Sequence, residues 1–395
     1  MSTGCDAIVA GHICLDIIPT IREGGFGFSP GRLLEVGPPI LSTGGPVSNT
    51  GLALHKLGIR TRLMGKIGAD SFGQSIKDVV SGHDPALAKG MIEIPGEVSS
   101  YSIILSPPDA DRMFLHCPGA NNTFGAEDID YSMLKEARLF HFGYPPLVRR
   151  VIENNGAELA EIFSRAKRTG ITTSLDMSMP DPRSFSGQVD WRVILAATLP
   201  YVDVYLPSLE ENLFTMYPEL FRELASRGEL AMGFISPSLL SSFGADLLAM
   251  GPAVVGLKLG PSGLYLRTGN EKAWGKTGRA CPQDMSSWIC RELWSPCFQV
   301  NVVGTTGAGD ATIAGFLGAL LRGCSPEDCA SMACAVGGCN VEAADALGGL
   351  QGWQQTWKRL KDGWPRRGLG FNLPGWRPAA EPGIWLGPND GKDTS

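Results

Sequence analysis

Short runs of apolar and β-branched residues alternate with amphipathic stretches along most of the chain. The run AIVAGHICLDII, residues 7–18, is interrupted by one glycine and predicts a buried strand that ends near Asp16. The stretch GGPVSNTGLALHKLG, residues 44–58, predicts a helix that ends at its last glycine, and TRLMGKIG, residues 61–68, predicts a further strand. A strand, a helix and a strand in this order indicate a parallel β-α-β unit.

The same alternation continues through the middle of the chain, where each apolar run is followed by helical or turn sequence. These runs are ARLFHFG (137–143), ITTSLDM (171–177), YVDVYLPS (201–208) and AVVGLKLG (253–260). Residues 98–117 differ, because two apolar runs flank the turn PPDAD and predict an antiparallel hairpin that projects as a lid. The chain is therefore predicted to be an α/β protein with a doubly wound, mostly parallel, Rossmann-like sheet and a small β lid.

Polar residues come at or just beyond the ends of the predicted strands. Asp16, Asp176, Ser208 and Lys258 all have this position. Doubly wound sheets bind their ligands at the carboxyl ends of the strands, so these residues are expected to share one cleft.

The composition limits the partners and the compartment. The chain has 395 residues, of which 43% are hydrophobic and 19% are charged, and this balance is typical of a globular protein. Its formal net charge of −6 disfavours nucleic acid as a partner. The 10 cysteines include no C-x-x-C pair, which indicates buried thiols in a reducing compartment. The N-terminus lacks a basic start, and no apolar run reaches about 18 residues, so we expect a cytoplasmic location and no membrane partner.

The stretch GTTGAGDATI, residues 304–313, places small residues directly before a carboxylate and an apolar run. Gly307, Ala308 and Gly309 let backbone N–H groups approach an anion, and the predicted helix adds a favourable partial positive charge. A carboxylate repels an anion, so Asp310 needs a separate role at this position. It is either a general base that accepts a proton from an attacking hydroxyl or a cap of the helix, and the local pattern leaves both open.

The motifs exclude the commonest nucleotide loops and match a different family. No G-x-x-x-x-G-K-[ST] loop is present, and no G-x-G-x-x-G follows the first predicted strand. Residues 44–58, followed by IGADSFG (67–73), resemble the first signature of the ribokinase-like, or PfkB, carbohydrate kinases, and VVGTTGAGDATIAGF (302–316) resembles their second. Further matches are PGAN (118–121), the strand-end Asp176, PSLEE (207–211) and LKLGPSG (257–263).

This resemblance implies an ATP- and Mg²⁺-dependent kinase that phosphorylates a hydroxymethyl group of a sugar or sugar-like molecule. It implies a ribokinase-like kinase domain at residues 1–350, with lid strands near 13–43 and 97–118. Residues 351–395 form a Trp-, Pro- and Gly-rich extension, which either packs on the domain through its Trp side chains or binds a partner. An exposed hairpin edge invites pairing, so we also expect a homodimer through the lid.

The resemblance also implies roles for individual residues. Asp310 is the expected catalytic base, and the N–H groups of Gly307, Ala308 and Gly309 are expected to stabilise charge on the transferring phosphate. Glu211 is expected to act through water on Mg²⁺, although it could equally be a surface charge. The residues expected to bind the substrate are Asp16, Gly44, Gly45, Asn49 and Arg112. The residues expected to bind the nucleotide are Thr305, Gly307, Gly309, Lys258, Gly260 and Asn340. The residues alone leave other roles open. Asn49 could cap its helix, Asp16 could cap a turn, and Gly44 and Gly45 could form a plain turn.

Two positions depart from the family pattern. Gly304 stands where the second signature usually carries Asp, a carboxylate associated with a monovalent-cation site, so dependence on potassium does not carry over. Ser208 stands where the family commonly has Asn, which predicts a changed Mg²⁺ network around Glu211. Neither departure removes Asp310.

The sequence leaves the acceptor open. Arg112 suits the carboxylate or phosphate of a sugar acid or sugar phosphate, whereas Asp16 and Asn49 suit an uncharged sugar without it. A nucleoside would need an aromatic wall such as Phe114 or Phe26. The alternative functions are therefore a nucleoside kinase and a catalytically weak module that senses sugars or nucleotides.

Overall fold

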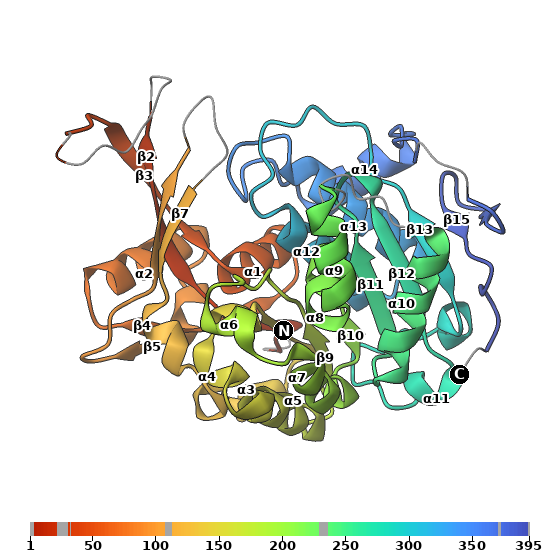
Figure 1. The fold of residues 1–395 in the computed structure, drawn as a ribbon, viewed down its shortest axis with the longest axis horizontal. Coiled ribbons are helices and arrows are strands. Elements are labelled where there is room, and N and C mark those ends of the chain that lie inside the picture. The colour runs from red at the N-terminus through yellow and green to blue at the C-terminus, as the bar shows by residue number, and fades with distance from the viewer. Residues whose placement is uncertain are drawn as a thin grey trace.

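The computed structural model describes residues 4–21, 31, 33–106, 113–228, 236–369 and 373–393, and these residues form two sheets. The larger sheet has 11 strands in the order β14-β15-β13-β12-β11-β10-β9-β8-β1-β4-β5, and the smaller sheet has 4. Helices surround the larger sheet, and the smaller sheet projects from one end of the body (Figure 1).

The centre of the larger sheet is parallel. Its strands, in spatial order, are β11 (Val254–Lys258), β10 (Val204–Tyr205), β9 (Thr172–Leu175), β8 (Leu139–Gly143), β1 (Ala7–Gly11), β4 (Thr61–Gly68) and β5 (Met91–Ile94). Nearly all residues of β1, β4, β8 and β9 are buried, because helices cover both faces of the sheet. The prediction of a doubly wound, mostly parallel sheet is confirmed.

Beyond β11 the sheet becomes antiparallel and ends in the C-terminal residues. The strands on this side, in spatial order, are β12 (Leu264–Thr268), β13 (Glu292–Ser295), β15 (Trp385–Leu386) and β14 (Arg377–Pro378). Trp376 in this tail packs on the rings of Tyr265 and Trp294, with ring centroids 6.2 and 5.8 Å away. The described part of the tail therefore packs against the sheet and extends it.

Two groups of helices cover the faces of the larger sheet. One face carries α1 (Pro46–Lys56), α2 (Ser71–His83), α11 (Glu271–Trp274), α12 (Ala308–Leu321), α13 (Pro326–Asn340) and α14 (Trp353–Lys361). The other side of the sheet carries α3 (Tyr131–Leu134), α4 (Arg149–Ile152), α5 (Ala157–Arg168), α6 (Phe185–Gln188), α7 (Trp191–Thr198), α8 (Leu209–Met216), α9 (Pro218–Ser226) and α10 (Pro237–Ala249). None of these helices, within the residues described, is long and apolar enough to cross a membrane.

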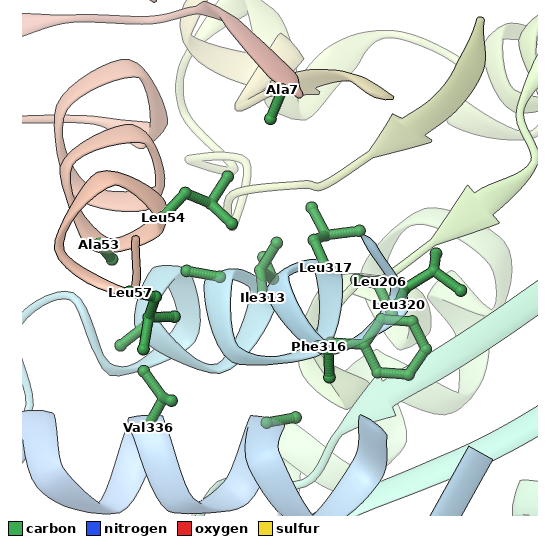
Figure 2. Packing of buried hydrophobic residues seen from close by; sticks show 14 of the residues in the cluster. Ala7, Ala53, Leu54, Leu57, Leu206, Ile313, Phe316, Leu317, Leu320 and Val336 are labelled. Carbon is green, nitrogen blue, oxygen red and sulfur yellow. The ribbon is translucent and has the colours of Figure 1, made fainter. Parts of the chain in front are cut away.

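Helix α12 is largely buried. Its side chains are apolar on nearly all sides because it lies between α1, α13 and the sheet, as Figure 2 shows for Ile313, Phe316 and Leu317. Leu54 of α1 and Val336 of α13 pack on it from two sides. This packing fixes the N-terminal end of α12, where the small-residue loop lies.

The smaller sheet is the lid, in the order β3 (Gly37–Gly44), β2 (Cys14–Thr20), β6 (Tyr101–Leu105) and β7 (Met113–Cys117). Strands β6 and β7 pair antiparallel, so the predicted hairpin is confirmed. The prediction of one strand over residues 7–18 is wrong. Gly11 has a φ of 119°, a Cβ there would lie 2.4 Å from the carbonyl oxygen of Gly143, and the chain leaves the larger sheet after it. Asp16 therefore belongs to lid strand β2 and not to the end of a strand in the larger sheet.

Candidate active site

Asp310 lies in the first turn of α12, directly after the small-residue loop. The helix begins after Gly307, whose φ of 72° suits glycine. One oxygen of the buried carboxylate accepts hydrogen bonds from Nδ2 of Asn49 and the hydroxyl of Tyr144, at 3.0 and 2.9 Å. The other oxygen accepts from Oγ1 of Thr50 at 3.2 Å. These donors belong to α1 and to the turn after β8, which favours a chemical role over the cap of α12.

A buried cluster of charges lies beside Asp310. Nζ of Lys258, the last residue of β11, donates to Oδ1 of Asp176 at 2.7 Å; Asp176 is buried, and the side chain of Lys258 is 11% exposed. Burial raises the pKa of Asp310 and the pKa of Asp176 above their ordinary values. Burial alone lowers the pKa of Lys258, but the carboxylates of Asp176, Glu211 and Asp310 together raise it. The ammonium group therefore stays charged and balances these carboxyl groups.

The small-residue loop fits an anion. Ala308 and Gly309 open a helix of 14 residues, whose first N–H groups have no partner inside the helix. The loop residues are only partly buried, so a ligand can reach them. A Cβ on Gly309 would lie 3.7 Å from Nζ of Lys258, which places a full positive charge beside these donors. N–H groups, a helix N-terminus and an ammonium group together suit a phosphate.

Glu211 and Ser208 cap helix α8 reciprocally. Oγ of Ser208 accepts from the N–H of Glu211 at 3.2 Å, and Oε2 of Glu211 accepts from the N–H of Ser208 at 2.6 Å. Glu211 is only partly exposed, burial raises its pKa, and the nearby Lys258 opposes that rise. Ser208 also forms a parallel bridge with Lys258, so three of the polar strand-end residues do lie together.

The acidic groups fit a loosely held Mg²⁺. Oδ2 of Asp176 is buried and has no hydrogen-bond partner within the described part of the chain, and Glu211 lies within electrostatic range of it. Among the residues that the structure describes, no three acidic, His or Cys side chains are close enough to form a complete metal site. Mg²⁺ usually takes only one or two carboxylates and completes its shell with water and substrate phosphates, so this arrangement fits it.

The lid side of the site centres on Asp16. Its Oδ1 accepts from Sγ of Cys14 at 3.4 Å, and burial raises its pKa to about 6. A Cβ on Gly44 would lie 2.4 Å from Oδ2 of Asp16, and a Cβ on Gly45 would lie 2.5 Å from Nδ1 of His12. Gly44 and Gly45 therefore let the backbone approach these side chains closely. Asn49 follows in α1, whose cap position is occupied by Gly45, so Asn49 is not the helix cap.

Two residues of the site were not predicted from the sequence. Tyr144 follows β8 with a φ of 59°, an unusual conformation for tyrosine, and its hydroxyl reaches Asp310. His12 lies between β1 and β2, and its ring stacks on Tyr144 with a centroid distance of 6.4 Å. Both residues directly follow strands of the parallel sheet, and that position was the signal in the sequence that could have found them.

Other predicted nucleotide contacts surround the loop. Thr305 is exposed beside it, and Gly260 begins the turn after β11. Asn340 ends α13, and its buried Oδ1 has no hydrogen-bond partner among the residues described. A Cβ on Gly304 would lie 3.0 Å from the carbonyl oxygen of Ala343, so the loop after α13 leaves little room for a side chain at that position.

The predicted acceptor contacts Arg112, Phe26 and Phe114 are only partly described. Arg112 and Phe26 lie outside the residues that the structure describes. Phe114 lies on β7, an edge strand of the lid, and is 57% exposed.

Comparison with known proteins decides the family. A sequence model of the pfkB family carbohydrate kinases matches residues 7–277 and 290–351. The chain belongs to the pfkB family. This pfkB kinase is 26% identical over 304 residues to an uncharacterized sugar kinase of Archaeoglobus fulgidus, and the match covers 76% of this chain and 98% of that protein. It is 25% identical to the probable fructokinase-3 of Arabidopsis thaliana, over 46% of this chain and 50% of that protein.

Solved structures show the fold of the pfkB kinase. A ribokinase from Arabidopsis thaliana, complexed with ribose and ATP, is similar with a TM-score of 0.67 at 18% identity, covering 91% of this chain and 99% of that one. A putative ribokinase II from E. coli, in complex with ATP and Mg²⁺, is similar with a TM-score of 0.66 at 18% identity, over 91% and 99% of the two chains. The kinase therefore has a ribokinase-like fold with a lid sheet, as the sequence predicted.

Proposed function

We propose that this pfkB kinase transfers the γ-phosphoryl group of ATP to a hydroxymethyl group of a sugar or sugar-like molecule, with Asp310 as the general base. The observation that carries this proposal is the position of Asp310, a buried carboxylate of raised pKa within one helical turn of an anion site and beside Lys258. A base and an anion site at this separation are what phosphorylation of an alcohol requires.

Different residues of the chain have different proposed roles in the reaction. Hydrogen bonds from Asn49, Thr50 and Tyr144 hold the Asp310 carboxylate in one orientation, and it takes the proton of the acceptor hydroxyl. Burial raises its pKa, which makes it a stronger base than an exposed carboxylate. The ammonium group of Lys258 favours the negative charge that develops on the transferring phosphoryl oxygens.

ATP with Mg²⁺ supplies the phosphoryl group and neutralises part of its charge when bound. The backbone of Gly307, Ala308 and Gly309 would hold its phosphates, and Glu211 would face the metal through water. Thr305, Lys258, Gly260 and Asn340 are the remaining proposed nucleotide contacts.

The acceptor binds between Asp310 and the lid. Asp16 offers carboxylate oxygens to its hydroxyl groups. Oδ1 of Asn49 is buried, has no hydrogen-bond partner in the part of the chain that the structure describes, and offers another acceptor atom. Gly44 and Gly45 let the chain pass close to the bound molecule, because no Cβ fits at either position.

The direct test is product formation, measured by mass spectrometry, from ATP and Mg²⁺ with a panel of uncharged sugars, sugar acids, polyols and nucleosides. We expect one phosphorylated sugar or sugar-like product. A phosphorylated nucleoside as the best product would favour the nucleoside kinase. Bound ATP without any product would contradict the proposal and favour a sensing module.

Acceptor affinity is expected to fall as the pH drops below about 6. The pKa of Asp16 is raised to about 6 by burial, so its carboxylate is charged at pH 8 and becomes protonated below pH 6. Protonation removes the charge that accepts hydrogen bonds from hydroxyl groups, so affinity falls up to about tenfold per pH unit below the pKa. Titration calorimetry of the acceptor without nucleotide, from pH 5 to 8, measures this without involving Asp310 chemistry. The Asp16→Asn variant should bind weakly at every pH, and a pH dependence as steep as that of the wild type would rule Asp16 out.

Two copies are proposed to pair through their lids. The edge strands β3 and β7 expose apolar side chains, including Ile40 (60% exposed), Leu41 (50%) and Phe114 (57%). Light scattering should give twice the chain mass of 42.1 kDa, and the double variant Leu41→Lys/Phe114→Lys should be monomeric. A matched change on helix α10, Leu239→Lys, should leave the dimer intact. A wild-type protein that is monomeric at 50 µM would contradict this pairing.

A further inference from the structure

His12 occupies the bend at which the chain passes from β1 of the larger sheet to β2 of the lid. His12 is 2% exposed, and among the residues that the structure describes neither of its ring nitrogens has a hydrogen-bond partner. Burial, and secondly the neighbouring His116, lower the pKa of His12 to about 3, so the ring is neutral. Buried polar atoms in folded proteins almost always have hydrogen-bond partners. The two ring nitrogens of His12 therefore indicate a position where a bound molecule supplies the partners.

His12 lies between the two halves of the candidate site. On one side its ring stacks on Tyr144, the donor to the catalytic base. On the other side its centroid is 5.3 Å from that of His116 on lid strand β7. Nδ1 of His116 is 3.0 Å from Oγ of Ser102, and Ser102 is opposite Asp16 in the lid sheet. His12 therefore contacts a neighbour of the base on one side and the lid strand β7 on the other.

The backbone holds His12 in this position. Its carbonyl oxygen accepts from the N–H of Val47 at 3.3 Å, and its own N–H donates to Gly143 at 3.5 Å. A Cβ on Gly45 would lie 2.5 Å from both Nδ1 and the carbonyl oxygen of His12. The start of α1 and the end of β8 thus fix the residue on both sides.

We propose that His12 recognises the acceptor, accepting a hydrogen bond from one hydroxyl group and donating one to the oxygen of another, and thereby selects an uncharged polyhydroxylated molecule. This inference rests on the proposed kinase function and names its substrate class. A neutral imidazole has one donor and one acceptor, which matches a pair of hydroxyl groups. The nearby carboxylates of Asp16 and Asp310 and Oδ1 of Asn49 are all acceptors, so they suit hydroxyl donors and repel a second carboxylate or a phosphate.

The test measures acceptor binding separately from turnover. D-fructose and D-ribose, with gluconate and fructose 6-phosphate as anionic counterparts, are titrated calorimetrically into the nucleotide-free protein. The variants are His12→Leu, which is apolar and similar in volume, and His12→Gln, which keeps one donor and one acceptor. His83→Leu, on α2, is the control. We expect at least a tenfold loss of neutral-sugar affinity in His12→Leu, partial recovery in His12→Gln, and no change in the control.

Two further readouts separate recognition from a structural role. The KM for the acceptor should rise while the KM for ATP and kcat change little. The melting temperature of His12→Leu should equal or exceed that of the wild type, because no unpaired nitrogen is buried. If His12→Leu does not fold, His12→Ala, which only removes atoms, takes its place.

The outcomes distinguish this inference from the kinase function. Unchanged neutral-sugar binding in His12→Leu overturns the inference, and so does tighter binding of gluconate or fructose 6-phosphate than of both neutral sugars. Failure of the wild type to bind either neutral sugar also overturns it. Neutral-sugar binding that depends on His12, without any phosphorylated product, overturns the kinase function alone and leaves the recognition role standing.

Discussion

Turnover is expected to fall about a thousandfold when Asp310 is replaced by Asn, while ATP binding persists. The amide cannot accept the proton of the acceptor hydroxyl, so the chemical step loses its base. The site should keep its shape, because the amide nitrogen can take the place of Oδ1 and donate to the hydroxyl of Thr50, while the amide oxygen still accepts from Asn49 and Tyr144. Single-turnover product formation at saturating ATP and acceptor measures the chemical step, and titration calorimetry measures ATP binding.

A matched control exists on the neighbouring helix. Asp328 occupies the same position in α13, two residues after the helix begins, that Asp310 occupies in α12. Asp328→Asn removes the same favourable interaction with a helix N-terminus, and it should leave turnover within about twofold. If Asp310→Asn retained turnover, or if both variants lost it equally, the assignment of Asp310 as the base would be wrong.

The second large effect is expected from Lys258→Met. This change removes the ammonium group that pairs with Asp176 and leaves a buried carboxylate without its counter-charge. The free energy of unfolding should fall by about 3–5 kcal/mol at pH 8. Turnover should fall by about a hundredfold or more, because the positive charge beside Gly309 is lost as well. Urea unfolding and steady-state kinetics measure the two losses.

The loss of stability and the loss of turnover are separated by the pH dependence of the stability and by a second substitution. Burial raises the pKa of Asp176 above its unfolded value, so the folded variant binds the proton more tightly than the unfolded chain does. Stability of Lys258→Met therefore falls as the pH rises through this interval, and the destabilisation should be smaller at pH 5 than at pH 8. Lys258→Met/Asp176→Asn should regain most of the stability at pH 8 but not the turnover. Recovery of turnover in the double variant would contradict the role of Lys258 at the anion site.

The local sequence pattern predicted the elements whose first and last residues are determined by their neighbours in the chain. The helix expected at 44–58 appears as α1, and the strand expected at 61–68 appears as β4 with the same bounds. The strand expected at 7–18 was wrong because the apolar pattern of β1 continues into β2 without a break. The departure of the chain from the larger sheet depends on the contact of Gly11 with Gly143, which is distant in the sequence. The local pattern of apolar residues cannot predict a contact between residues so far apart in the chain.

The site also contains residues that the local sequence predicts and residues that it does not predict. Asp310 and the loop at Gly307 could be predicted, because a run of small residues directly before a helix indicates an anion site from the local sequence alone. The partners of Asp310 come from α1 and the turn after β8, so Tyr144 was missed although it follows a predicted strand. The pairing of Lys258 with Asp176 was anticipated only as a shared cleft, since both residues end parallel strands.

The C-terminal residues decide how the larger sheet ends. A long open strand edge can pair with another chain and start aggregation, and β13 would present such an edge if β15 did not cover it. The outermost strand, β14, is only two residues long and includes Pro378, which has no N–H to donate. The match to the pfkB family ends at residue 351, so this blunt edge is built by residues that the family pattern does not contain. The edge of the larger sheet on this side is therefore covered by a segment that lies outside the family match.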